Sequence, residues 1–251
     1  MSLSVVSHNC YWFQGAPSLW GQERNQAHPR IVEALTRLYR QLAPDVLCLQ
    51  EVPSEEAAQC LADGLGMQVA FARGGTREAY GGSVLWRGLD AEAEDLTFSS
   101  GVAVFERVCL VLRGKGPQSD WRLANVHLSS NRYAPGRKGD PVRLAELQAL
   151  FADCQPDVVA GDFNATPGSP AYLDMEARGY TQGGVLACEP VAPEERRVDY
   201  IWIRDPGQFA ARPADFKPAS LVLAADADTQ LSDHPPIITH LCCDKATKDP
   251  T

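Results

Sequence analysis

Long apolar runs are missing from this sequence, and its first residues lack the pattern of a secretory leader. No apolar stretch approaches the roughly 20 residues that a transmembrane helix needs. The chain passes from Met1 to Val5 without a basic segment or a long apolar core. We therefore expect no membrane anchor, and we expect a cytoplasmic location.

Zinc-binding cysteine patterns are missing as well. The chain has 8 cysteines, yet none forms a Cys-x-x-Cys pair and no Cys/His group has zinc-finger spacing. Several lie in apolar runs, as Cys48 does within residues 46–49, which is typical of buried free thiols in a reducing compartment. We therefore expect free, mostly buried thiols.

Positively charged residues are fewer than negatively charged ones. The sequence has 23 Lys and Arg against 32 Asp and Glu, a formal net charge of −9. A surface that binds long duplexes mainly by neutralising phosphates has an excess of Lys and Arg over Asp and Glu. The composition disfavours such a surface and mildly favours a small or single-stranded substrate. Part of the acidity also fits a metal site.

In other respects the composition is that of an ordinary globular protein. The 251 residues are enough for a substantial core, and 45% of them are apolar. No internal repeat or linker divides the chain. We expect a single domain over residues 1–244, followed by a flexible C-terminal tail over residues 245–251.

Hydrophobic spacing predicts helices and strands that alternate early in the chain, with extended segments in the middle. This order predicts an α/β protein in which two sheets pack face to face with helices outside. The predicted helices cover residues 24–42, 54–66 (with Ser54 as N-cap), 141–154 and 169–178. The predicted strands cover residues 5–9, 46–50, 68–73, 83–86, 101–105, 107–112, 121–128, 158–160, 198–203, 220–223 and 236–241.

An acid and an amide follow one of these strands directly. Asp162 and Asn164 lie two positions apart after the apolar residues 158–160, so their side chains project in the same direction. A carboxylate and an amide aimed together suit a hydrated divalent cation or a phosphate oxygen. Gly161 lets the backbone or a ligand approach closely. Taken alone, the segment also fits an ordinary turn.

Other apolar strands end in polar side chains too. Glu51 ends one strand and Asp199 lies inside another, and each is costly to bury without a partner. A histidine held by a carboxylate is suited to acid–base work or to polarising a phosphate, and Asp199 could hold His234 in this way. Singly, each position also fits a turn, a salt bridge or a core histidine. The remaining candidates are Asn9, His127 and Asp233, with Ser130 and Arg132 as phosphate donors.

Together these strand ends predict one crevice, because strand ends converge in layered α/β proteins. Carboxylates, amides and imidazoles suit a hard cation such as Mg²⁺ or Mn²⁺. Zinc suits the set less well, since thiol ligands are absent and the histidines lack the HxxxH type of spacing.

The combination resembles the endonuclease/exonuclease/phosphatase superfamily, whose fold is DNase I-like. The resemblance spans nearly the whole chain and implies a four-layered α/β/β/α sandwich and a Mg²⁺-dependent phosphoester hydrolase. The segments that carry it are Asn9 and residues 49–52 (Leu-Gln-Glu-Val), 126–128 (Val-His-Leu), 161–164 (Gly-Asp-Phe-Asn), 198–201 (Val-Asp-Tyr-Ile) and 232–235 (Ser-Asp-His-Pro).

The resemblance also implies a role for each position. On the metal side, Glu51 would be the main ligand of Mg²⁺ (or Mn²⁺), with Asn9 beside it and Asp233 supporting the region.

On the phosphate side, Asp162 would orient or activate the attacking water, and Asn164 would hold a phosphate oxygen. His127 and His234 would stabilise the transition state, with His234 oriented by Asp199. Whether Asp162 or His234 is the general base stays open.

The substrate is less well defined. Tyr11 stands where abasic-site endonucleases usually carry an acid, and His127 stands where they carry Tyr, so that activity is disfavoured. Residues 127–132 are locally most like the His-Leu-x-Ser segment of tyrosyl-DNA phosphodiesterase 2. We expect a phosphodiesterase that acts on a nucleic acid, as a nuclease or an end-processing enzyme, and the sequence indicates no protein partner.

Other readings stay open. One is a small-molecule phosphoesterase for a nucleotide, an inositol or sugar phosphate, or a sphingomyelin-type lipid. Another is a catalytically silent binding module on the same fold. The aromatic run Tyr11, Trp12 and Phe13 could stack a base or a tyrosyl ring, but we expect it to pack at the rim or in the core.

Overall fold

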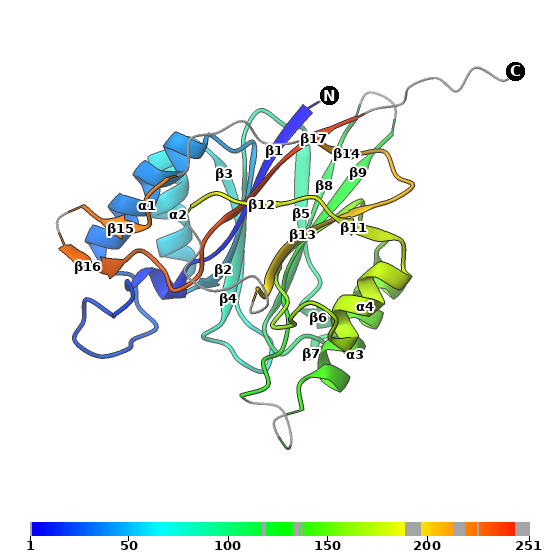
Figure 1. The fold of residues 1–251 in the computed structure, drawn as a ribbon, viewed down its shortest axis with the longest axis horizontal. Coiled ribbons are helices and arrows are strands. Elements are labelled where there is room, and N and C mark those ends of the chain that lie inside the picture. Colours follow the sequence, from blue (N-terminus) through cyan, green and yellow to red (C-terminus); the bar gives the residue numbers. More distant parts are fainter. Residues whose placement is uncertain are drawn as a thin grey trace, which may run out of the picture.

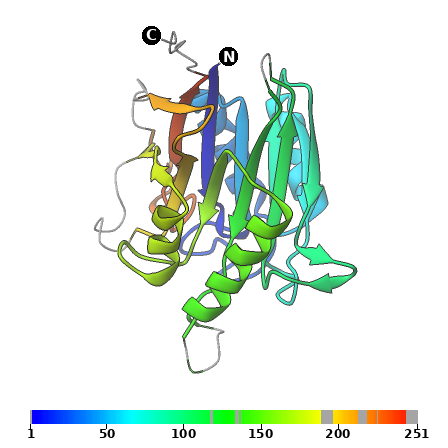
Figure 2. The ribbon, with the colours of Figure 1, turned by 90° about the vertical axis from the view of Figure 1, so that its right-hand side faces the viewer.

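The computed structural model describes residues 2–116, 119–132, 136, 138–188, 197–212, 219–224 and 226–243. Within them, two large β-sheets pack face to face (Figures 1 and 2). The first runs in the order β12 (Val185–Leu186), β17 (Ile237–Cys242), β1 (Ser2–Asn9), β2 (Val46–Val52), β4 (Gly81–Trp86) and β3 (Gln68–Ala72), with β14 (Ala210–Arg212) also on β17. The second runs in the order β11 (Tyr180–Gln182), β13 (Asp199–Arg204), β10 (Val158–Asp162), β9 (Trp121–His127), β8 (Val108–Gly114) and β5 (Ala91–Asp95).

Helices cover the outer faces of both sheets. Helices α1 (Pro29–Leu42) and α2 (Glu55–Leu65) lie on the first sheet, and α3 (Asp140–Asp153) and α4 (Pro170–Ala177) lie on the second (Figure 1). The predicted fold class, a four-layered α/β/β/α sandwich, is confirmed. None of the helices in the described part of the chain is both long and apolar enough to span a membrane.

Strand β2 shows why the layers form. Its side chains are buried on both faces, which explains its continuous apolar sequence. Leu47 and Leu49 pack toward α1 and α2, whereas Val46 and Cys48 pack into the core between the sheets. Because its side chains alternate between the two faces, β2 contributes both to the core beneath α1 and α2 and to the core between the sheets.

The helix ends follow local chemistry. Helix α1 begins at Pro29, five residues later than we expected, because proline fits the first turn, where its missing N–H costs nothing. Ser54 caps α2 as predicted, with its side chain accepting from the Ala57 N–H at 3.2 Å. Gly66 ends α2 in the left-handed conformation that favours glycine.

One strand prediction was wrong, and several short strands were missed. Residues 101–105 do not form one strand, since only Val102–Ala103 (β7) pairs, with Phe98–Ser99 (β6), across a tight hairpin. Gly101 has φ +81°, which breaks an extended run at that point. Strands β5, β11, β12, β14 and β16 (Asp226–Gln230, paired with β15, Val222–Leu223) were missed because they are short or polar edge strands without an apolar pattern.

The register brings the strand ends together. In the second sheet Asp162 lies opposite His127 on β9 and opposite Asp199 on β13. In the first sheet β1 runs parallel to β2, with Asn9 opposite Gln50. All these positions lie where their strands meet the same end of the sandwich.

A buried polar bridge joins the two sheets just beneath this end. Gln50 donates from Nε2 to Asn125 Oδ1 at 2.7 Å, and Asn125 donates from Nδ2 to the carbonyl oxygens of Leu49 and Ser83, both at 3.0 Å. Buried amide N–H groups are costly unless they are satisfied. The bridge therefore fixes how the first sheet sits against the second where the polar residues gather.

Gly161 is the residue at which side-chain size should matter most for stability. It has φ +145°, and a Cβ placed on it would lie 1.8 Å from the carbonyl oxygen of Val126. We expect Gly161→Ala to lower the free energy of unfolding by about 3 kcal/mol or more, because the clash is with backbone. Urea denaturation measures this.

Gly168 is the matched control for this substitution. It also has positive φ (+77°), but a Cβ there would meet nothing within 4 Å. Gly168→Ala should cost only about 1 kcal/mol. Equal losses for the two variants would contradict the close-approach explanation.

Candidate functional site

A cavity of about 700 Å³ opens at the end of the sandwich where these strands finish. Ten of its lining residues come from loops that follow strands or precede them, and four lie at strand ends or in the turn after β1. The lining residues are Tyr11, Trp12, Glu23, Asn25, Glu51, Tyr80, Arg107, Ser130, Asn131, Arg132, Asp162, Asn164, Asp233 and His234.

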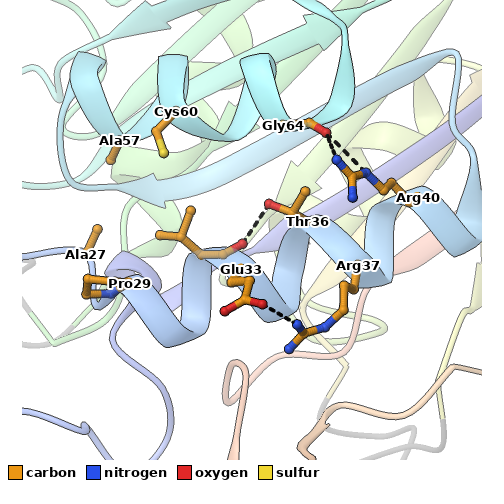
Figure 3. A pocket seen from close by; sticks show the side chains of 10 residues that line it. Ala27, Pro29, Glu33, Thr36, Arg37, Arg40, Ala57, Cys60 and Gly64 are labelled. Atoms are coloured by element: carbon orange, nitrogen blue, oxygen red, sulfur yellow. Dashed lines mark hydrogen bonds and ion pairs between the residues drawn. The ribbon is translucent and has the colours of Figure 1, made fainter.

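A second hollow lies between α1 and α2 and is chemically different (Figure 3). Its polar groups are already paired, with Glu33 bound to Arg37 and Arg40 bound to the carbonyl oxygen of Gly64. It brings together no set of acids and histidines, so the cavity at the strand ends is the candidate site.

Two buried carboxylates share one amide at the base of the cavity. Asn9 donates from Nδ2 to Glu51 Oε1 at 3.2 Å and to Asp162 Oδ2 at 3.0 Å. Glu51 has φ +54° at a register shift between β2 and β4, and this bulge aims its side chain into the site. Burial raises the pKa of Glu51 to about 7, although Arg107 and His234 oppose the shift.

These oxygens form a donor set for a hard cation. Carboxylate and amide oxygens are the ligands that Mg²⁺ and Mn²⁺ prefer, and a buried carboxylate such as Glu51 is stabilised by a cation beside it. Ligand atoms of Asp162, Asp199 and His234 also lie within 4.8 Å of one another. We favour the set around Glu51, because a nitrogen of His234 is already bonded to Asp199.

His127 lies beside these carboxylates at the end of β9. Its Nε2 is 3.2 Å from Asp162 Oδ2 and also contacts the guanidinium of Arg107. Burial, reinforced by Arg107, lowers the pKa of His127 to about 4, so the ring is neutral at pH 7. One nitrogen cannot donate to Asp162 and accept from Arg107 at once, which leaves Arg107 able to turn to another acceptor.

Asp162 is ionised despite its burial. Burial alone would raise its pKa, but attraction to His127, His234 and Arg107 outweighs burial and lowers the pKa below its usual value. The backbone N–H of Asn164 also donates to Asp162 Oδ1 at 2.8 Å. Asp162 therefore carries a negative charge at neutral pH, and its hydrogen bonds fix the position of its carboxylate.

His234 and Asp199 form a hydrogen-bonded pair. His234 Nδ1 donates to Asp199 Oδ2 at 2.7 Å. Burial lowers the pKa of His234, but Asp199, Asp162 and Asp233 outweigh it and hold the pKa well above its usual value. The ring is therefore an imidazolium at neutral pH, with Nε2 as its second donor.

The loop that carries His234 is tied to the end of β1. His8 Nε2 lies 2.9 Å from the carbonyl oxygen of His234, so Nε2 carries the hydrogen and donates it. His8 Nδ1 then accepts from the Tyr39 hydroxyl at 2.7 Å. Ser232 donates to the carbonyl oxygen of Asn9 at 2.6 Å. Sequence reasoning did not find His8.

The remaining predicted residues also lie at the cavity. Asn164, in the left-handed region at φ +47°, donates from Nδ2 to the carbonyl oxygen of Leu128 at 3.0 Å, which leaves its second amide hydrogen. Ser130 has a buried hydroxyl with no hydrogen-bond partner among the described residues. Arg132 and Asp233 line the cavity from exposed positions.

Arg107 and Tyr80 are also site residues that the sequence did not reveal. Arg107 is 4% exposed, and its guanidinium lies 4.4 Å from the centre of the Tyr80 ring. Tyr80 in turn packs edge-on against Trp12 at 4.9 Å. A signal for Arg107 was present, because a cation at the start of an apolar strand is as costly to bury as Glu51 at the end of one.

Comparison with known proteins identifies the family. The profile of the endonuclease/exonuclease/phosphatase family matches residues 6–234. The chain belongs to this family. Its members are phosphoester hydrolases, and the resemblance seen in the sequence is confirmed.

Individual relatives are distant. The chain is 26% identical over 223 residues to "Protein angel homolog 2" of Danio rerio, a match that covers 78% of this chain and 37% of that protein. The chain thus spans little more than a third of that relative's length.

Solved structures of the family share the fold. The human Nocturnin catalytic domain, solved with a bound sulfate anion, has a TM-score of 0.69 at 18% identity and covers 97% of this chain and 95% of its own. ANGEL2, described as a 2′,3′-cyclic phosphatase, has a TM-score of 0.61 at 19% identity, with 96% and 95% covered. Humanised D. rerio TDP2 has a TM-score of 0.59 at 17% identity, with 96% and 99% covered.

Proposed function

We propose that this protein is a metal-dependent phosphodiesterase that hydrolyses a phosphoester in a nucleic acid. One observation carries the proposal. Two buried carboxylates and an amide adjoin a hydrogen-bonded His–Asp pair and a buried arginine in a single cavity. Such a cavity can hold a cation on one side and a phosphate on the other.

Glu51 and Asn9 would hold the metal, with Asp233 nearby. A bound Mg²⁺ or Mn²⁺ would offset negative charge on the phosphate and on the leaving oxygen. The residues present fit such an ion, because Glu51 is buried with a raised pKa and a second buried carboxylate, Asp162, shares the Asn9 amide N–H group with it.

The phosphate side is built from fixed donors. His234, oriented by Asp199, presents Nε2–H to a phosphate oxygen, and Asn164 presents its remaining amide hydrogen. Arg107 exchanges its contact with His127 for a phosphate oxygen, which leaves His127 to donate to Asp162. Donors that are already in place cost no reorganisation as charge develops on the phosphate.

Asp162 would orient the attacking water. It is held by Asn9 and by the N–H of Asn164, and its lowered pKa keeps it an acceptor for a water hydrogen. Its low basicity favours orientation over complete removal of the proton.

The nucleic-acid substrate is supported by the relatives. ANGEL2 is described as a 2′,3′-cyclic phosphatase and was solved with adenosine-2′,3′-vanadate, a nucleoside ligand. A cavity of about 700 Å³ is also the size of small-ligand sites. A nucleotide or another small phosphoester is therefore the second candidate.

Hydrolysis of bis-p-nitrophenyl phosphate tests the activity. We expect turnover with Mg²⁺ or Mn²⁺ and none with EDTA, because the cation offsets the phosphate charge. A protein that shows no turnover of this ester or of natural esters with any metal is instead a silent binding module. A panel of 5′-tyrosyl DNA, single-stranded RNA, abasic duplex, cyclic phosphate ends and sphingomyelin then identifies the substrate, and hydrolysis of sphingomyelin alone would contradict the nucleic-acid proposal.

Arg107 gives a sharper test of the phosphate side. Arg107→Met keeps an unbranched stem over Tyr80 but removes the charge, so kcat/KM should fall about 10- to 100-fold, the size of a lost charge-assisted hydrogen bond. Arg107→Lys should restore part of the loss, since it keeps the charge without the planar fork.

Arg113→Met is the control for this loss, because Arg113 pairs with Glu94 far from the cavity. Steady-state kinetics with bis-p-nitrophenyl phosphate compares the three variants. Unchanged kcat/KM in Arg107→Met would remove Arg107 from the proposed site.

A further inference from the structure

Three consecutive residues of left-handed backbone follow the first strand. Tyr11, Trp12 and Phe13 have φ values of +45°, +50° and +56°, a conformation that non-glycine residues adopt singly, not in series. A hydrogen bond stabilises the start of this turn, where the Tyr11 N–H donates to Asn9 Oδ1 at 3.1 Å. Strain of this kind persists only where the surrounding structure enforces it.

The turn sends the three rings to different places. Phe13 is buried in the core beneath α1, and Trp12 packs on Tyr80 with its Nε1 donating to the carbonyl oxygen of Ala79 at 2.5 Å. Tyr11 is left half-buried at the cavity, where its hydroxyl donates to Glu23 Oε1 at 2.6 Å. The expected rim and core packing accounts for Trp12 and Phe13, but it leaves the Tyr11 ring facing the cavity.

The loop that carries Glu23 is itself anchored. Gln14 is fully buried, and its side-chain oxygen accepts from the Arg24 N–H at 2.6 Å and from the Ser18 hydroxyl at 3.2 Å. Arg24 turns its side chain toward Trp20, while its two neighbours Glu23 and Asn25 line the cavity. The loop thus presents a carboxylate and an amide from fixed backbone.

The chemistry of this wall differs from that of the phosphate side. A carboxylate repels a further phosphate, whereas the flat Tyr11 ring offers a stacking surface. Glu23 accepts hydrogen bonds only, and the Tyr11 hydroxyl already donates to its Oε1. The group that fits is an uncharged planar ring with N–H donors on its edge.

We propose that Tyr11, Glu23 and Asn25 form a nucleobase subsite for the nucleoside attached to the reacting phosphate. The subsite favours guanine, because its N1–H and 2-amino group lie side by side and can both face one carboxylate. This rests on the proposed function, since it places the base next to a phosphate held by Arg107 and His234.

Equilibrium binding of mononucleotides tests the subsite without turnover. The probes are the 5′- and 3′-monophosphates of guanosine (GMP) and of inosine (IMP). Guanine differs from the base of inosine only by its 2-amino group. The third probe is ribose 5-phosphate, which has no base. Calorimetry with Mg²⁺ should show a GMP isomer binding about tenfold more tightly than the matching IMP, as expected for a hydrogen bond to a charged acceptor. Ribose 5-phosphate should bind more weakly than either.

Substitutions separate the two parts of the subsite. Glu23→Gln should bring the GMP and IMP affinities together, and Tyr11→Leu should reduce the advantage of GMP over ribose 5-phosphate. Glu33→Gln is the control, because Glu33 is an exposed acid on α1 that pairs with Arg37. It should leave the wild-type ratios in place.

Equal affinity of the wild type for GMP and IMP would overturn the proposal, and so would a GMP preference that survives Glu23→Gln. Absence of binding by every nucleotide would overturn it too. Metal-dependent turnover of bis-p-nitrophenyl phosphate, an ester without a base, reports separately on the proposed function. That function can therefore stand when the subsite fails.

Discussion

Replacing Glu51 by Gln should lower kcat for bis-p-nitrophenyl phosphate by about a thousandfold at saturating Mg²⁺. Glu51 is buried beside Asn9 and Asp162, and its charge is the proposed anchor of the cation. A catalytic cation contributes several kcal/mol to transition-state stabilisation, and each 1.36 kcal/mol is about tenfold in rate. The concentration of Mg²⁺ needed for half-maximal activity should rise as well.

The fold should survive this change. A buried carboxylate with a raised pKa costs free energy in the metal-free protein, so the urea midpoint of Glu51→Gln without metal should equal or exceed that of the wild type. Glu55→Gln, an exposed acid in the first turn of α2, is the control and should keep full activity. Near-normal turnover by Glu51→Gln at the Mg²⁺ concentration that suffices for the wild type would contradict the assignment of Glu51 as a metal ligand.

His234→Ala should lower kcat by about 10²–10⁴-fold, the usual contribution of a positioned acid or base. Its ring is hydrogen-bonded to Asp199, which raises its pKa and leaves Nε2–H as the proposed donor to the phosphate. Asp199→Asn should cause a smaller loss, because the ring then lacks the carboxylate that fixes its orientation and keeps it charged.

A double-mutant cycle decides whether the two residues act as a pair. If Asp199 acts only through His234, the double variant should be no slower than His234→Ala alone. Strictly additive losses would show independent roles and contradict the proposed arrangement. His240→Ala, on β17 and away from the cavity, should leave turnover unchanged.

The layers were predictable from the sequence because apolar patterns are local. The run at residues 46–49 and the helical spacing of α1 each report burial without knowledge of the rest of the chain. The gathering of Asp162, His127 and Asp199 was predictable for a related reason. Each stands at the end of an apolar strand, and the strands of one sheet share an edge.

Other features depended on contacts between segments that lie far apart in the sequence. Arg107 reaches the site because β8 begins beside Tyr80, which lies 27 positions earlier in the chain. The bridge between Gln50 and Asn125 depends on how one sheet packs on the other. Short polar strands such as β5 form because a neighbour offers its edge, and their own residues carry no signal of it.

The catalytic roles of the site residues and the single domain over residues 1–244 stay predictions. Residues 244–251, which include the expected tail, lie outside the described part of the chain. The kinetic variants above test the roles directly.

The tie between His8 and the carbonyl oxygen of His234 joins positions 226 residues apart, and β17 pairs with β1 along the same edge. A chain that is still being synthesised and has emerged only to residue 230 therefore contains Glu51, Asp162 and Asp199 but not His234 or β17. In such a nascent chain one side of β1 has no partner strand, and the loop that carries His234 is not yet tied to the end of β1. A nascent chain of this length therefore holds Glu51 and Asp162 but cannot yet form the pair between His234 and Asp199.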